Sequence, residues 1–216
     1  MTKRNCADAG IEISDLLQQN TKRQESALPE AWISEKLTKI QEAVWEGSDN
    51  FDSLEALLRD FNTVQRAKQD EGGGVHCLKT VEALTYGLEV CTSASTLAQM
   101  LGVLELLTRE HEGVEHALAS ATEHMSVKVT KEHTSSEDIQ VPGLKLLANL
   151  STDSGEGLDA IISAGVLQVV LAALRTLPQS ARATETALRL LRNVTELDEE
   201  SPAVVGGGAV DLAVSA

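Results

Sequence analysis

The stretch from Gly143 to Leu177, GLKLLANLSTDSGEGLDAIISAGVLQVVLAALRTL, decides the fold of this chain. The stretch opens with the pattern apolar-x-apolar-apolar, in which x is any residue. The same pattern starts at Leu104, Leu144 and Leu188, at spacings of 40 and 44 residues. A second apolar element follows each copy, where Thr122, Gly165 and Gly208 recur at spacings of 43 residues. Helical patterns that recur about every 40–45 residues are typical of an α-solenoid.

The same stretch resembles the armadillo repeat, which consists of a short helix, a turn at Gly, a second helix and a longer third helix. Gly157–Ala164 matches the short helix, Gly165 the turn and Val166–Thr176 the second helix. Ala181–Glu196 matches the third helix and ends in the family's Asn-containing tail, here LLRNV. The resemblance covers roughly residues 72–216. It implies an all-α fold, a right-handed solenoid of about three repeats.

The two ends of the chain differ from this pattern. Residues 1–28 are polar with one apolar cluster around Ile11–Leu17, and we expect most of this tail to be disordered. Residues 29–71 predict two amphipathic helices, an N-terminal extension that packs on the first repeat. The last repeat stops part-way through its second helix. We therefore expect the array to be truncated at its C-terminal end.

Within the array, apolar spacing predicts helices at Val75–Glu89 and Ser95–Thr108. His111–His116 is expected to be an exposed loop, because a glycine interrupts it. Residues 122–136 form the weakest helical stretch, rich in β-branched residues and closed by a loop at His133–Ser136. Pro142 predicts that the next helix either starts near Val141 or kinks there.

Composition excludes several classes of function. The net charge of −15 opposes binding to nucleic acid or to an anionic membrane. The three cysteines form no disulfide framework, and the N-terminus lacks the apolar run of a signal peptide. We expect a reducing compartment, the cytoplasm or the nucleus. The glycosylation sequons at Asn149 and Asn193 are then coincidental, since both lie in helical patterns.

No catalytic or metal-binding constellation is recognisable in the sequence. His111 and His116 are five residues apart, whereas a helical zinc pair needs four. Cys77 and Cys91 lack further ligands at paired spacing and are expected to be core residues. The glycine trios at 72–74 and 206–208 lack the Lys-Ser/Thr of a phosphate-binding loop. We expect no enzyme activity, no cofactor and no metal.

The resemblance instead implies a peptide-binding face. In armadillo proteins the third helices line the concave side, and an Asn near the end of each helix and a residue four positions earlier grip an extended peptide. The Asn position falls on Arg109, Asn149 and Asn193, and the earlier position on Glu105, Lys145 and Arg189. The family's usual Trp is missing there, because Trp32 and Trp45 precede the array. The basic members of this set favour a ligand that carries acidic residues.

We therefore predict a non-catalytic protein-interaction module, an adaptor or scaffold that binds a protein or peptide on its concave face. One alternative is a HEAT-type structural or cytoskeletal scaffold, whose units have two helices; a distinct short helix at Gly157–Ala164 would favour armadillo. Another is the repeat portion of a larger regulatory protein whose active region is missing. The uncapped C-terminal end also offers a surface for self-association.

Overall fold

The computed structural model describes residues 30–45, 55–56, 58–59, 61, 78–152 and 155–197. Within these ranges every regular element is a helix and none is a strand, as the apolar period predicts. The helices are α2 (Glu30–Trp45), α4 (Leu78–Val90), α5 (Ala94–Leu107), α6 (His111–Ala119), α7 (Thr122–Glu132), α8 (Glu137–Leu150), α9 (Gly155–Ala164), α10 (Val166–Thr176) and α11 (Ala181–Leu197).

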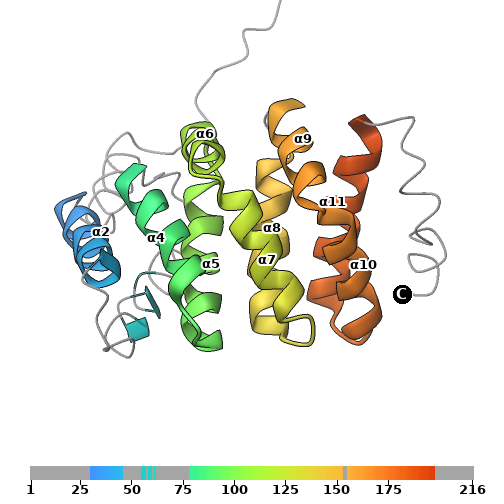
Figure 1. The fold of residues 1–216 in the computed structure, drawn as a ribbon, viewed down its shortest axis with the longest axis horizontal. Helices are drawn as coiled ribbons and strands as arrows, with labels where there is room; N and C mark the ends of the chain where they lie inside the picture. Colours follow the sequence, from blue (N-terminus) through green and yellow to red (C-terminus); the bar gives the residue numbers. More distant parts are fainter. Residues whose placement is uncertain are drawn as a thin grey trace, which may run out of the picture.

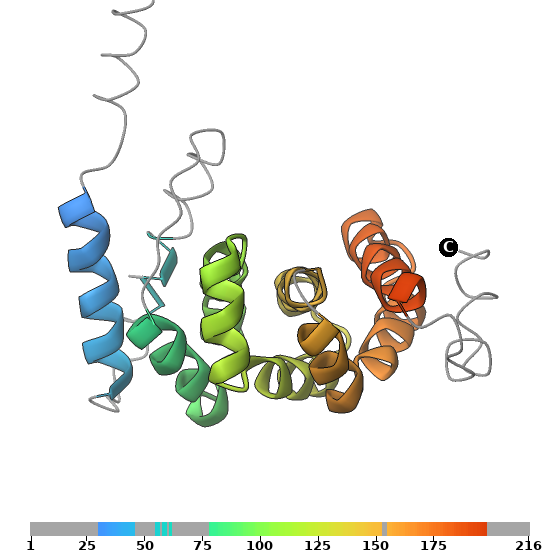
Figure 2. The same ribbon diagram turned by 90° about the horizontal axis from the view of Figure 1, so that it is seen from above.

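The helices form two layers of a curved array. Helices α5, α8 and α11 stand side by side in chain order, with α5 packed on α8 and α8 on α11 (Figure 1). Helices α4, α7 and α10 form the other layer, and α5, α8 and α11 line the inner side of the curve (Figure 2). The shorter helices α6 and α9 lie at one end of the layers. We call α5, α8 and α11 the inner layer.

The hydrophobic core is a continuous, mostly aliphatic cluster that extends from Ile40 on α2 to Val194 on α11. Helix α8 lies at its centre, between α5 and α11, and its leucines 144, 146, 147 and 150 are fully buried. Fully burying one leucine contributes about 1.5–3 kcal/mol. Because aromatic residues are scarce, the core consists mainly of closely packed Leu, Val, Ile and Ala side chains.

The helix α8 contradicts one expectation. It begins at Glu137 and runs through Pro142, so the first of the two alternatives, a start near Val141, is wrong. A proline inside a helix costs about 3 kcal/mol. The burial of the four leucines that follow outweighs this cost. Gln140 links α8 to the end of α7, because its Nε2 donates to the backbone oxygens of Thr130 (2.6 Å) and His133 (3.0 Å).

Residues 111–119 form the helix α6, so the prediction of a loop at His111–His116 is also wrong. Gly113 is not a helix breaker here but the point where α6 approaches the end of α5. A β-carbon on Gly113 would lie 1.8 Å from the backbone oxygen of Leu107. On α9, a β-carbon on Gly157 would likewise lie 2.2 Å from the backbone oxygen of Leu150. Each glycine lets a short helix cross over the last carbonyls of an inner helix.

The turn between the short helix and the second helix is left-handed in both places where the structure describes it. Gly165 separates α9 from α10 with φ 89° and ψ 39°, which confirms its predicted role as the turn. Ala121 separates α6 from α7 with φ 54° and ψ 35°. The structural partner of Gly165 is therefore Ala121, one residue before the Thr122 that the sequence pattern matched to it.

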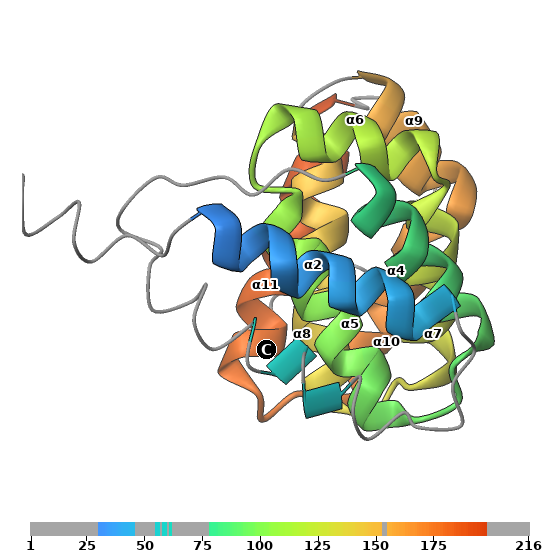
Figure 3. The ribbon, with the colours of Figure 1, turned by 90° about the vertical axis from the view of Figure 1, so that its left-hand side faces the viewer.

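At the N-terminal end, α2 packs across α4 (Figure 3). The described residues between 55 and 61 are helical, and Leu58 and Phe61 are completely buried, as expected for an amphipathic extension. The predictions for the tail 1–28, for Cys77 and for the end of the array at 198–216 lie outside the described residues.

No single helix within the described ranges has the length and apolar character to cross a bilayer. Helices α9 and α10 meet those criteria only as a pair, which is bent by 65° at Gly165.

The two left-handed turns predict opposite effects of substitution. Gly165→Val should lower the free energy of unfolding by about 1–2 kcal/mol or more, because side chains are unfavourable at positive φ. Ala121→Gly should raise it by about 0.5–1 kcal/mol. Glycine removes the cost of a side chain in the left-handed conformation, and the larger conformational entropy of glycine in the unfolded chain offsets part of that gain. Urea denaturation of both variants measures this. A shift of the same sign in both would contradict the assignment of the two turns.

Candidate functional site

The six residues predicted to bind a partner all belong to the inner layer or to the turn that follows α5. Glu105, Lys145 and Arg189 lie within the helices α5, α8 and α11. Asn149 and Asn193 lie in the last turns of α8 and α11, and Arg109 follows the end of α5. The structure places these residues in three settings: the two asparagines bond to neighbouring helices, Glu105 pairs with Arg109, and Lys145 and Arg189 line a cavity.

The two asparagines join neighbouring inner helices. Asn149 Nδ2 donates to the backbone oxygen of Glu105 (3.1 Å) and to Thr108 Oγ1 (3.3 Å), which ties α8 to the end of α5. Asn193 Nδ2 donates to the backbone oxygen of Ala148 (3.5 Å) and to Ser151 Oγ (2.9 Å), which ties α11 to the end of α8. We call this arrangement the asparagine tie.

Each tie adds a second donor to a carbonyl near a helix end, beside the hydroxyl of Thr108 or Ser151 that already donates to it. The last carbonyls of a helix have no donor within the helix, and burying them unpaired is costly. Because an amide nitrogen has two N–H groups, both donors of Asn149 and both donors of Asn193 are used inside the chain. The two amides therefore hold the inner layer together, and a ligand could receive their hydrogen bonds only if a tie opened.

Glu105 and Arg109 form an ion pair at the end of α5. Arg109 donates from Nε (3.1 Å) and Nη2 (2.7 Å) to Glu105 Oε1, and Glu105 is only 5% exposed. The guanidinium also lies at the C-terminal end of α5, where a positive charge is favourable. Arg109 borders a small cavity of about 170 Å³ that Asn149 and His111 also line. The side chain of Glu105 is held by Arg109 rather than presented to a partner.

Lys145 and Arg189 lie in a different setting, between α8 and α11. They line a cavity of about 330 Å³ together with Arg182, Glu185 and Thr186 of α11. We call this cavity the basic groove. It adjoins a cavity of about 520 Å³ between α5, α8 and α11, because Lys145 and Arg182 line both. The two cavities are thus neighbours on the inner layer.

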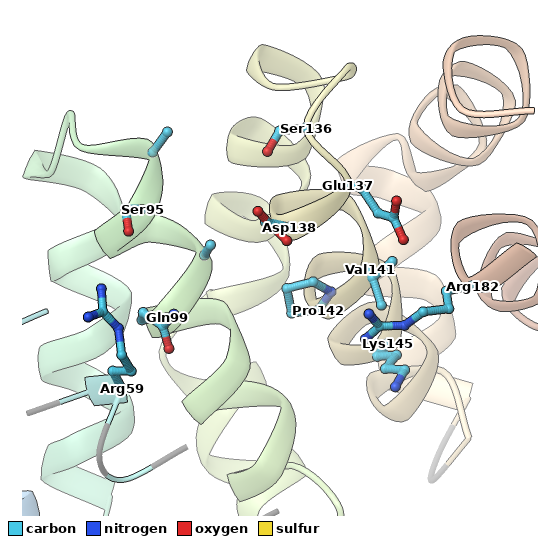
Figure 4. A pocket seen from close by; sticks show the side chains of 12 residues that line it. Arg59, Ser95, Gln99, Ser136, Glu137, Asp138, Val141, Pro142, Lys145 and Arg182 are labelled. Atoms are coloured by element: carbon cyan, nitrogen blue, oxygen red, sulfur yellow. The ribbon is translucent and has the colours of Figure 1, made fainter. Parts of the chain in front are cut away.

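The larger cavity carries charges of both signs (Figure 4). Arg182 reaches from α11 toward Lys145 and Val141 of α8, so two cationic groups converge at the boundary with the basic groove. Glu137 and Asp138 lie in the first turn of α8, where a negative charge is favourable. Arg59 lines the far side, but it is already paired with Glu55.

The basic groove holds an excess of positive charge that the described part of the chain does not neutralise. Lys145, Arg182 and Arg189 form no ion pair with any residue that the structure describes, and Glu185 is the single acidic residue in the lining of this cavity. The whole chain nevertheless has a net charge of −15. An isolated positive cluster on such a protein attracts an anionic group locally.

Arg182 is the member of this cluster that the sequence did not reveal. It lies seven residues before Arg189, two helical turns away on α11, and therefore on the same side of the helix. The armadillo pattern marks two positions near the end of each third helix and none near its start. Helical spacing from Arg189 is the signal that would have found it.

The other candidate motifs have ordinary partners. His111 pairs with Glu115 (3.3 Å) and His116 with Glu112 (3.5 Å), all on the exposed side of α6. Within the described residues no group of three or more His, Cys, Asp or Glu side chains is placed to hold a metal ion. Cys91 is buried, and burial raises the pKa of its thiol, which disfavours the reactive thiolate.

Comparisons with protein-family models, with curated proteins and with solved structures give no match to this chain.

The asparagine tie predicts different effects for two similar hydroxyl groups. Ser151 Oγ donates to the backbone oxygen of Ala148 (2.7 Å), and Thr195 Oγ1 donates to that of Arg192 (2.9 Å). Ser151 also accepts a hydrogen bond from the buried Asn193. Ser151→Ala should therefore lower the free energy of unfolding by about 1–2 kcal/mol, because it leaves a buried donor unpaired. Thr195→Ala is the control and should change it by no more than about 0.5 kcal/mol.

Chemical denaturation of both variants distinguishes the tie from a general loss of hydroxyl groups. Equal effects of the two substitutions would show that the tie contributes nothing beyond the local helix hydrogen bond.

Proposed function

We propose that this chain is a non-catalytic interaction module that binds an extended, acidic segment of another protein along its inner layer. The observation that carries the proposal is the basic groove, where Lys145, Arg182 and Arg189 converge from two helices without an ion-pair partner in the described chain. Carboxylate side chains of the ligand would supply those partners.

The arrangement of the two neighbouring cavities favours an extended chain over a compact ligand. The basic groove continues into the larger cavity toward α5, and the two are lined by the starts and middles of adjacent inner helices. A strand-like peptide rises about 3.3 Å per residue, and packed helices are about 8–10 Å apart. Three peptide residues thus span one helix-to-helix step. The ligand would cross α8 and α11 and reach toward α5.

Electrostatics favours a peptide over nucleic acid. A nucleic acid carries a phosphate charge at every step and would meet the repulsion of the whole protein, with its net charge of −15. A peptide can place two or three carboxylates over the basic groove and neutral residues elsewhere. Glu137 and Asp138 would further disfavour acidic ligand residues at the α5 side. The local charges therefore also set where the acidic part of the ligand lies.

The proposal takes the fold to be an armadillo-like solenoid. Three pairs of residues with matching roles support this: Gly113 and Gly157 at the helix crossings, Ala121 and Gly165 at the left-handed turns, and Asn149 and Asn193 in the ties. Each pair is separated by 44 residues. The short helix α9 is distinct from α10, which favours the three-helix armadillo unit over the two-helix HEAT unit. A catalytic role has no comparable support.

A double charge reversal tests the basic groove. Lys145→Glu with Arg189→Glu should weaken the binding of a fluorescent glutamate-rich peptide by about tenfold or more, because close charge pairs contribute at least about 1.5 kcal/mol each. Thermal stability should stay unchanged, since neither side chain forms an ion pair within the described chain.

The matched control is Lys128→Glu with Arg175→Glu, which makes the same change of charge at exposed positions of α7 and α10. Fluorescence anisotropy at physiological salt compares the three proteins. An equal loss in both double variants would mean that net charge, and not the basic groove, governs binding. A peptide rich in lysine that binds as tightly as the acidic peptide would also overturn the proposal.

A further inference from the structure

The outer layer carries an unusual concentration of exposed apolar surface on α4. Within the described residues the large hydrophobic side chains that remain exposed are Leu78 (41%), Tyr86 (42%) and Val90 (46%), and all three belong to this helix. Together with Glu82 they follow one another at intervals of four residues, so they form a single stripe along α4. Isolated exposed apolar residues are ordinary, whereas apolar residues gathered on one face are typical of interaction surfaces.

A cavity of about 370 Å³ lies beside this stripe, between α4 and the turn from α6 to α7. Tyr86, Met125, Ala119 and Ala121 give it apolar walls. Thr85 also lines it, and its hydroxyl is hydrogen-bonded to that of Thr122 (2.7 Å), which joins α4 to α7 beneath the cavity. We call it the α4 cavity. Its base is therefore fixed before any partner arrives, and its flexible methionine can adapt to an apolar side chain.

The charges at the α4 cavity are opposite to those of the basic groove. Glu82 and Glu89 line it from α4, and both are exposed. His124 lines it from α7 and is paired with Glu123 (2.7 Å). The protein as a whole adds to this negative field, with its net charge of −15. An apolar pocket between two carboxylates favours a ligand that places an apolar side chain in the pocket and a lysine or arginine side chain beside each carboxylate.

We propose that the α4 cavity is a second docking site, which binds a basic, amphipathic segment of a partner protein. An apolar residue of that segment enters the cavity against Tyr86 and Met125, and a second apolar residue covers Val90. Lysine or arginine residues one turn away pair with Glu82 and Glu89. The segment is thus a short helix with apolar and basic residues on adjacent positions, a common form of helix recognition.

This inference goes beyond the proposed function, because it concerns the opposite layer and the opposite charge. Helix α4 lies in the outer layer with α7 and α10 (Figures 1 and 2). The basic groove is instead lined by residues of α8 and α11, which belong to the inner layer. The two sites can be occupied at the same time. The chain would then connect an acidic segment on its inner side with a basic segment on its outer side.

A designed peptide tests the site on the full chain. The probe is an amphipathic helix with leucine on one face and lysine beside it, and its counterpart has glutamate in place of lysine. Binding of the lysine peptide should weaken by about tenfold in Glu82→Lys with Glu89→Lys, and also in Tyr86→Ala, which removes the main wall of the cavity. The control is Glu156→Lys with Asp159→Lys, which changes the net charge equally at exposed positions of α9.

Loss of binding in the two α4 variants, with binding retained in the α9 control, supports the proposal. Equal loss in the α4 and α9 charge variants shows that the peptide senses only net charge, and it overturns the proposal. The proposal is also overturned if the lysine peptide shows no saturable binding, or if Tyr86→Ala leaves its binding unchanged. A photo-crosslinking residue at position 90 that captures residues 1–29 of the same chain would assign the cavity to an internal segment and equally contradict it.

Discussion

The hydrogen bonds of Asn149 and Asn193 are the interaction on which the rest of the structure depends. Each asparagine donates to the last turn of the preceding inner helix, where carbonyl groups lack partners within the helix. The ties hold the ends of α5, α8 and α11 at one level, and the leucines of α8 fill the space between them. Because the helices are aligned in this way, Lys145 of α8 and Arg182 and Arg189 of α11 line the same cavity.

Two further constraints recur together with the ties at an interval of 44 residues. Gly113 and Gly157 allow a short helix to cross over the carbonyls of an inner helix, where a β-carbon would not fit. Ala121 and Gly165 then turn the chain through a left-handed conformation into the outer layer. Each pair allows one step of the same chain path. The chain leaves an inner helix, crosses its end as a short helix, and turns into the outer layer before it returns to the next inner helix. The binding surfaces on the two layers are consequences of this path.

The sequence predicted elements that depend on local pattern. The helix Val166–Thr176, the turn at Gly165 and the third helix beginning at Ala181 follow from apolar period and from glycine chemistry, and the structure confirms them. Gly113 misled the prediction of a loop, and Pro142 misled the alternative that placed a helix start near Val141. The cost of each residue in a helix is local, whereas the packing that offsets it is tertiary. Asn149 and Asn193 were recognised as special, but their bonds to Ala148, Ser151, Glu105 and Thr108 depend on neighbouring helices. Arg182 was missed because its relation to Lys145 crosses from α11 to α8.

The most direct test of the central claim is hydrogen–deuterium exchange of the full chain, with and without a saturating glutamate-rich peptide. If the inner layer is the binding face, bound peptide will slow exchange in α8 and in the first half of α11, around Lys145, Arg182 and Arg189. Exchange in α4, α7 and α10 will stay the same. Slower exchange in the outer layer, or none at all in α8 and α11 while the peptide is bound, would contradict the account.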